Sequence, residues 1–299
     1  SLTLELLPRN IHLLHSPDFI PPHGGPWKSV ITIHDLSFLL YPHFLTPDSR
    51  KYYNNQIQHA VRRADAILAI SNTTRNDILE YLSVKPEKVT TVYLAPHERF
   101  QPQPTHIVES TLSRLKIPRQ YLLFVGTFEP RKNISGLLEA YSSLASKRRD
   151  IPQLIMIGRH GWLDEPIESL IHKLNLQDQV QILTNVDAQD LPSIYTGALA
   201  LLLPSHYEGF GFPVLESMAC GTAAIISDKG SLPEIAGDAA LQCNPNSTET
   251  IEEAISLVLT DSKLRKDLEQ KGIKQSARFT WQKCCQQTLD VYNKVLQST

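Results

Sequence analysis

The 299-residue sequence lacks the features that mark several classes of protein. It contains no run of about 18 apolar residues, so we expect no transmembrane helix. Residues 1–9 lack the basic start and the small-residue cleavage site of a secretory signal peptide. The net charge of −2 argues against a general nucleic-acid-binding protein. These absences favour a cytoplasmic protein that does not bind nucleic acid.

Cysteine is scarce, and the four cysteines follow no metal-binding spacing. We expect them to be reduced thiols, as is usual in the cytosol. The sequence also has no Walker-type Gly-x4-Gly-Lys-Ser/Thr motif and no Asp-x-Asp pair. We therefore expect neither ATP hydrolysis nor a bound metal or cofactor.

Short apolar runs alternate with amphipathic stretches through most of the sequence. The runs predict strands at residues 30–33, 66–70, 89–93, 121–125, 154–157, 180–183, 198–203 and 223–227. The amphipathic stretches predict helices at residues 49–63, 73–82, 134–145 and 251–259. Such alternation is typical of α/β domains with mostly parallel sheets that helices cover on both faces.

The Pro-rich segment 96–104 predicts a linker, so we divide the chain near residue 105. Residues 105–280 contain at least five predicted strands, enough for a complete doubly wound domain. Residues 1–104 contain three clear strands and no opening Gly-rich βα turn, so we expect an incomplete domain. Residues 281–299 show a helical pattern that could pack back on the first domain.

The segment Glu208-Gly-Phe-Gly-Phe-Pro-Val-Leu-Glu216 is the most informative motif. It follows a predicted strand, and Pro213 suits the first position of a helix. A helix N-terminus presents N–H groups and a positive dipole end to an anion. We expect the N–H groups of Val214 and Leu215 to be free for this anion. A phosphate site between two carboxylates suggests a nucleotide-sugar.

Two other strands end in polar residues. Arg131 and Lys132 follow the strand at 121–125, in the crevice where open α/β sheets bind ligands, and their charges suit a diphosphate. His34 follows the strand at 30–33 and could donate a hydrogen bond to a phosphate or a sugar hydroxyl. The simpler alternatives are a solvated basic pair and a structural histidine. His160 and Trp162 are weaker candidates for the same crevice.

Three segments together resemble family 4 of the retaining glycosyltransferases. They are Gly126-Thr-Phe-Glu-Pro-Arg-Lys-Asn133, Pro204-Ser-His-Tyr-Glu-Gly-Phe-Gly-Phe-Pro-Val-Leu-Glu-Ser-Met-Ala-Cys-Gly221 and Gly230-Ser-Leu-Pro-Glu234. The resemblance implies the GT-B fold, with two Rossmann-like domains facing a cleft. Residues 1–104 would be the acceptor-side domain, 105–280 the nucleotide-sugar-binding domain, and 281–299 the returning helix.

The resemblance also implies a role for each matching residue. Glu208 would contact the donor sugar, and Glu216 would bind the ribose hydroxyls. Arg131 and Lys132 would hold the diphosphate, while His34 would contact the sugar or the phosphate from the opposite wall. The remaining donor-binding residues would be Gly126, Thr127, Gly209, Phe210, Gly211, Val214 and Leu215. Thr127 stands where the family often has arginine, so phosphate binding would depend more on Arg131 and Lys132.

The implied activity is retaining, metal-independent transfer of a hexose from a UDP- or GDP-sugar to a glycan or lipid-linked acceptor. Some relatives act on lipid-linked acceptors at the inner membrane face, so the resemblance allows peripheral membrane association. The main alternative is a nucleotide-sugar-binding module without transfer, because the first domain is incomplete. Two further alternatives on this fold are an epimerase and a phosphorylase.

Overall fold

The computed structural model describes residues 6, 10–21, 24–148, 150–159, 161 and 167–297. The chain divides into two compact units. Unit 1 comprises Ser1–Ala95 and Phe279–Thr299, and unit 2 comprises Pro96–Arg278. Within the described residues, no helix combines the length and the apolar character that crossing a membrane requires.

Unit 1 contains a four-stranded parallel sheet in the order β1-β2-β3-β4. Its elements are β1 (Leu13–Ser16), β2 (Lys28–Ile33), α2 (Ser37–Leu40), η2 (Pro42–Phe44), α3 (Pro47–Arg63), β3 (Ala66–Ala69), α4 (Asn72–Tyr81), η3 (Pro86–Lys88), β4 (Val89–Thr91) and α13 (Trp281–Gln297).

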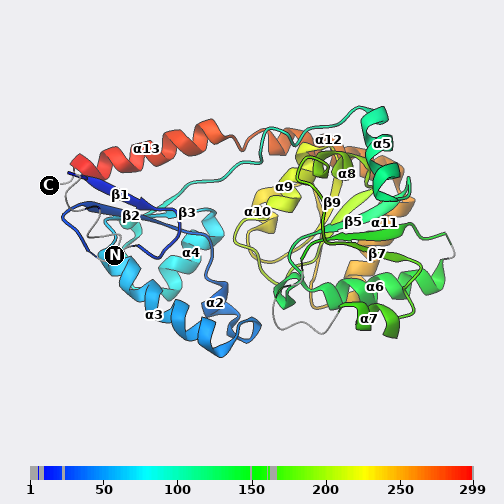
Figure 1. The fold of residues 1–299 in the computed structure, drawn as a ribbon, viewed down its shortest axis with the longest axis horizontal. Helices are drawn as coiled ribbons and strands as arrows, with labels where there is room; N and C mark the ends of the chain where they lie inside the picture. Colours follow the sequence, from blue (N-terminus) through cyan, green and yellow to red (C-terminus); the bar gives the residue numbers. More distant parts are fainter. Residues whose placement is uncertain are drawn as a thin grey trace. The chain divides into compact units, whose positions relative to one another are not determined.

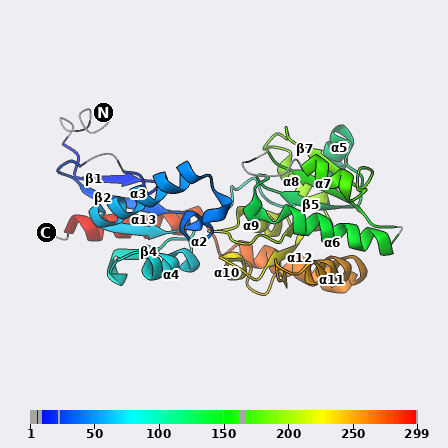
Figure 2. The same ribbon diagram turned by 90° about the horizontal axis from the view of Figure 1, so that it is seen from below.

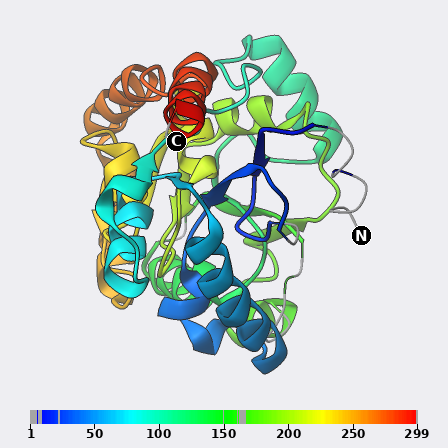
Figure 3. The ribbon, with the colours of Figure 1, turned by 90° about the vertical axis from the view of Figure 1, so that its left-hand side faces the viewer.

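Helices cover both faces of this sheet. Figures 1 and 3 show α13 on one side and α3 and α4 on the other. Because side chains alternate along a strand, Ile31 of β2 packs in the cluster with α3 and α4. Its neighbour Val30 packs in the cluster that contains Val291 and Val295 of α13. The returning helix therefore completes the core of unit 1.

Unit 2 contains a six-stranded parallel sheet in the order β10-β9-β8-β5-β6-β7. Its strands are β5 (Tyr121–Val125), β6 (Gln153–Ile157), β7 (Val180–Leu183), β8 (Ala200–Leu203), β9 (Ala223–Ser227) and β10 (Leu241–Cys243). Its helices are α5 (Thr105–Leu115), η4 (Pro130–Lys132), α6 (Ile134–Lys147), α7 (Ile167–Lys173), α8 (Leu191–Gly197), α9 (Phe212–Ala219), α10 (Leu232–Ala236), α11 (Thr248–Thr260) and α12 (Ser262–Ser276).

The sheet of unit 2 is wound in two directions. From β5 the chain runs outward through β6 and β7, then returns to place β8 on the other side of β5. Figure 1 shows α6 and α7 on one face and α8 and α9 on the other. Figure 2 shows α11 and α12 side by side. The loops after β5 and β8 lie at this point of reversal, which is where ligands bind in open α/β sheets.

The predicted α/β class and all eight predicted strands are confirmed. Within the described part of the chain, two strands were missed, β1 and β10, and both lie at sheet edges. Each is short and contains a polar residue, His15 or Gln242, so neither forms an apolar run. Both strands are only partly buried, so they need few apolar residues, and a search for apolar runs does not find them.

The structure divides the chain at Pro96 and not near residue 105. The predicted linker 96–104 packs on unit 2, because the Phe100 ring lies edge-on to Tyr195, with 5.9 Å between ring centroids. In addition, the Gln103 N–H donates to Thr196 Oγ1 over 3.2 Å. Proline content correctly indicated an irregular segment but not the unit to which it belongs.

Candidate active site

The loops after β5 and β8 are joined by hydrogen bonds at the point where the sheet of unit 2 reverses. The β5 loop carries Arg131 and Lys132 in η4, and Asn133 follows them. The His206 N–H donates to the Arg131 carbonyl over 2.8 Å. The Asn133 side-chain amide donates to the Pro204 carbonyl over 3.1 Å. Two segments more than 70 residues apart in sequence thus form one surface.

A buried cluster of ion pairs lies on this surface. Lys132 Nζ is 2.6 Å from Glu208 Oε1, and Arg131 NH1 is 2.8 Å from Glu208 Oε2. Arg131 NH2 also lies 2.7 Å from Glu129 Oε1. The Ser205 hydroxyl donates to Glu208 Oε1 over 2.8 Å. Lys132 and Glu208 are only 8% and 5% exposed, so each charge depends on its partners.

The environment of Glu208 keeps its carboxylate ionised. Burial alone would raise the pKa of Glu208, since an apolar environment disfavours charge. The charges of Lys132 and Arg131 and the hydrogen bonds from Lys132 and Ser205 outweigh burial and lower this pKa to about 2. Glu208 is therefore an acceptor in this cluster and not an acid that could supply a proton.

The loop after β9 fixes the backbone around Glu208. The Ser231 hydroxyl donates to the carbonyls of Glu208 and Phe210, each over 2.9 Å. Gly230 has a φ of +61°, and a Cβ there would lie 2.8 Å from the backbone N and O of Glu208. Only glycine fits this position, so three loops, after β5, β8 and β9, define the site.

The expectation that the N–H groups of Val214 and Leu215 are free is wrong. Helix α9 begins at Phe212, one residue before the predicted Pro213. Both N–H groups therefore donate to the carbonyl of Gly211, over 3.1 and 3.3 Å. Gly211 has a φ of +102°, which allows the helix to start there. Among described residues, the N–H groups of Gly211 and Phe212 have no partner.

Glu216 lies on α9, apart from the ion-pair cluster. Its Oε2 accepts a hydrogen bond from the Tyr195 hydroxyl of α8 over 3.0 Å. Burial raises the pKa of Glu216 to about 7, although the Tyr195 hydrogen bond and the Arg99 charge act to lower it. Glu216 thus titrates near neutrality, unlike Glu208.

Gly126 and Thr127 lie on the turn after β5, as predicted. The Gly126 N–H donates to the Ile157 carbonyl over 2.9 Å. A Cβ on Gly158 would lie 1.9 Å from the Gly126 carbonyl oxygen, so the chain segments after β5 and β6 touch by their backbones. The Thr127 side chain is exposed.

His34 lies in unit 1 at the carboxyl end of β2. Its side chain is exposed, and Nε2 donates to the Pro17 carbonyl over 2.9 Å. A carbonyl only accepts, so this contact places the proton on Nε2. His160 and Trp162 lie outside the described residues.

Sequence reasoning missed several residues of the site, which are Glu129, Tyr195, Ser205 and Ser231. Glu129 could have been suspected from its place two residues before Arg131. Ser205 and Ser231 lie inside two of the segments that carry the family resemblance, but the resemblance gave them no role. Tyr195 had no signal in the sequence, because its partner Glu216 lies on a different helix.

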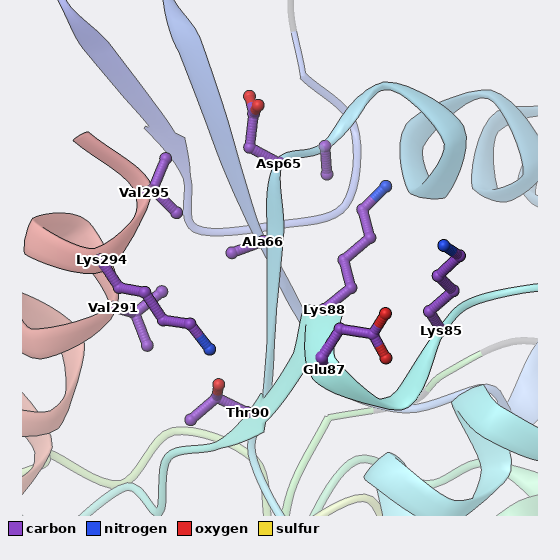
Figure 4. Close-up of a pocket in the computed structure, with 10 residues that line it drawn as sticks. Asp65, Ala66, Lys85, Glu87, Lys88, Thr90, Val291, Lys294 and Val295 are labelled. Atoms are coloured by element: carbon purple, nitrogen blue, oxygen red, sulfur yellow. The ribbon is translucent and has the colours of Figure 1, made fainter. Parts of the chain in front are cut away.

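A separate hollow of about 470 Å³ in unit 1 does not belong to this site (Figure 4). It lies at the amino-terminal ends of β3 and β4, beside α13, and its lining includes Lys85, Glu87, Lys88 and Lys294. Lys88 donates to the Val61 carbonyl over 2.7 Å and thereby caps α3. Open α/β sheets bind ligands at the opposite, carboxyl ends of their strands. Elsewhere, the described residues contain no group of three or more His, Cys, Asp or Glu suited to a metal.

Comparison with known families gives two matches. Residues 113–275 match the model described as "Glycosyl transferases group 1", and residues 1–95 match "Glycosyltransferase Family 4". The first match covers unit 2 almost completely and includes every residue of the ion-pair cluster.

Individual proteins are similar over most of the chain. O-antigen chain mannosyltransferase B from Escherichia coli is 33% identical over 94% of this chain and 74% of its own length. The serotype-specific mannosyltransferase WbdA from Escherichia coli is 31% identical over 94% of this chain but 35% of its own length. Among solved structures, sucrose-phosphate synthase from Thermosynechococcus elongatus aligns with a TM-score of 0.81 at 21% identity, covering 96% of this chain and 74% of that one.

Proposed function

The chain belongs to the group 1 glycosyl transferases and has their GT-B fold, as the sequence predicted, and from this premise we propose its reaction. It transfers a hexose, mannose, from UDP- or GDP-mannose to a glycan or lipid-linked acceptor in the synthesis of an O-antigen-like polysaccharide. The names of two relatives, both mannosyltransferases, support mannose as the hexose of the donor. The observation that supports transfer is the buried cluster of Arg131, Lys132 and Glu208 where the sheet reverses.

The charges of the cluster suggest how the donor would bind. Arg131 and Lys132 carry two positive charges that Glu129 and Glu208 balance in the absence of donor. A diphosphate would compete with Glu208 for the two cations. The carboxylate oxygens of Glu208 that the cations release could then accept hydrogen bonds from the sugar. The Phe212 N–H, at the positive end of α9, would donate to a phosphate oxygen.

The remaining roles follow the family resemblance. Gly209, Phe210 and Gly211 would present their backbones to the sugar, Gly126 and Thr127 would line the phosphate side, and Glu216 would bind the ribose. His34 would contact the sugar or the phosphate. We propose retention through attack on the same face, with the leaving phosphate as the base. The two basic side chains would stabilise the leaving charge without a metal.

The test is nucleotide binding followed by transfer. Calorimetric titration with UDP, GDP and ADP should identify one base that binds. With the matching mannose donor, Lys132→Ala and Glu208→Ala should each lower transfer by about 10²-fold or more, since each removes a charge that stabilises the transition state. Transfer rates should be equal with and without EDTA.

The matched control is Lys147→Ala, because Lys147 forms an exposed ion pair with Glu252 outside the site. This variant should retain the full rate. Transfer at a near-normal rate by Lys132→Ala would contradict the assignment. Nucleotide binding without product from any acceptor would favour a binding module, and conversion of the donor without acceptor would favour an epimerase.

A further inference from the structure

The hydrogen bond between Tyr195 and Glu216 gives the two carboxylate oxygens of Glu216 different environments. Oε2 accepts from the Tyr195 hydroxyl over 3.0 Å. Within the part of the chain that the structure describes, Oε1 has no hydrogen-bond partner. The Glu216 side chain is partly exposed, and Oε1 is not among the buried polar atoms that lack a partner, so it is open to a ligand while Tyr195 holds Oε2.

The position of the Tyr195 hydroxyl is itself fixed by packing. The Tyr195 side chain is fully buried. Its ring lies edge-on to Phe100 at an interplanar angle of 72°, and its carbonyl accepts a hydrogen bond from the Thr222 hydroxyl. The Thr222 bond fixes the Tyr195 backbone, and rotation of the ring away from Glu216 would break its contact with Phe100. Tyr195 therefore restricts the orientation of the carboxylate.

Among the residues that the structure describes, few titratable groups influence Glu216. They are Tyr195 on α8, Arg99 on the segment before α5, and Cys220 at the end of α9. Burial raises the pKa of Tyr195 well above its usual value and that of the Cys220 thiol to about 12, so both stay neutral. Near neutral pH, Glu216 is therefore the group in this set that changes charge.

We propose that Tyr195 is a positioning residue that holds Glu216 to accept a hydrogen bond from the ribose diol of the nucleotide donor. This inference rests on the proposed function, and it adds a residue to the donor site and a reason for ribose selectivity. An ionised carboxylate accepts hydrogen bonds better than a protonated one. Ribonucleotide binding should therefore strengthen as pH rises through about 7, where Glu216 loses its proton.

The variant Tyr195→Phe removes only the hydroxyl. Because the Tyr195 hydrogen bond lowers the pKa of Glu216, its loss should move the midpoint of this pH dependence upward. The preference for the ribonucleoside diphosphate over its 2′-deoxy and 3′-deoxy forms should fall by about 10-fold at neutral pH, as expected for one hydrogen bond to a charged group.

The experiment is calorimetric titration of the full chain with these three ligands from about pH 5.5 to about pH 8.5, a range that spans the titration of Glu216. The matched control is Tyr141→Phe. Tyr141 is also fully buried in unit 2, but its hydroxyl donates to the Pro152 carbonyl over 2.8 Å. This control should lose stability without any change in ribose preference or pH midpoint.

A double-mutant cycle separates positioning from general damage to the fold. In the Glu216→Gln background, Tyr195→Phe should have no further effect on ribose preference. An unchanged preference and an unchanged pH midpoint in Tyr195→Phe alone would overturn the role of Tyr195 and leave the donor site intact. Failure of the unmodified chain to bind any nucleoside diphosphate would instead overturn the proposed function, and this inference with it.

Discussion

Glu129 places a second carboxylate beside Arg131 at the candidate site. It is 5% exposed and lies 2.7 Å from Arg131 NH2, on the opposite nitrogen from Glu208. Arg131 is thus held between two acids. Glu129 contributes the negative charge that makes the sum of the two cations and two carboxylates zero, and this balance limits the attraction of the site for a diphosphate.

The variant Glu129→Gln should therefore bind the nucleoside diphosphate more tightly, by about 3-fold to 10-fold, because one unit of positive charge is no longer balanced. Its affinity should also fall more steeply with salt. Titration at two salt concentrations measures both effects. Glu252→Gln, which removes the acid of an exposed ion pair, is the control. Weaker binding by Glu129→Gln would show that Glu129 serves the site through Arg131 geometry and not through charge.

The sequence predicted the charged residues of the site better than the residues that hold them in position. Arg131, Lys132 and Glu208 follow strands, and the parallel arrangement of those strands brings their ends to one edge of the sheet. Tyr195 acts through a contact that depends on how α8 packs beside α9, and Ser205 acts through a contact that depends on the path of the loop after β8. The expectation for Leu215 failed because the start of a helix is uncertain by one or two residues.

Asn133 connects the elements around the site. It has a φ of +55°, and its side-chain amide donates to the carbonyls of Pro204 and Pro245 over 3.1 and 2.7 Å. It thus ties the start of α6 to the loops after β8 and β10. Asn133 thus has a left-handed backbone conformation and a buried side-chain amide that makes two hydrogen bonds. Two substitutions can separate the contribution of the backbone conformation from that of the hydrogen bonds.

Asn133→Ala should lower the free energy of unfolding of unit 2 by about 2–4 kcal/mol, because both hydrogen bonds are lost and alanine is strained at positive φ. Asn133→Gly loses the same bonds without this strain and should cost about 1 kcal/mol less. Urea unfolding followed by circular dichroism measures the difference. Equal losses would mean that the backbone conformation relaxes in the alanine variant.

At the scale of the elements, the central strands were predictable because they are buried on both faces. Leu122, Leu123 and Leu201 are fully buried, and such continuous apolar runs are typical of parallel strands between two helix layers. The order of the strands was not predictable from these runs. Nothing in the run at 198–203 shows that β8 pairs with β5 and not with β7, although that pairing creates the site.

For unit 2 as a whole, ionised Glu208 should make the free energy of unfolding fall at low pH. Its pKa is about 2 in the folded chain, below its usual value of 4.5. The stabilisation is therefore complete above about pH 4.5 and is lost as pH falls through about 2. Protonation of Glu208 should lower the free energy of unfolding by about 3 kcal/mol over this range. Urea unfolding at a series of pH values should show the decline, and Glu208→Gln should flatten it. A decline of the same slope in the variant would assign the effect to other acids.

The position of α13 sets the order in which the molecule can be completed during synthesis. Its Val291 and Val295 cover the face of the unit 1 sheet that carries Val30 and Leu68. A ribosome adds about 5–20 residues per second, and domains generally fold as units while the chain emerges. All of unit 2 precedes α13, so it can fold while that face of the sheet still lacks its helix. The unit 1 strands are therefore covered on this face only after all of unit 2 has been made, and a chaperone that binds apolar surface has access to them during that interval.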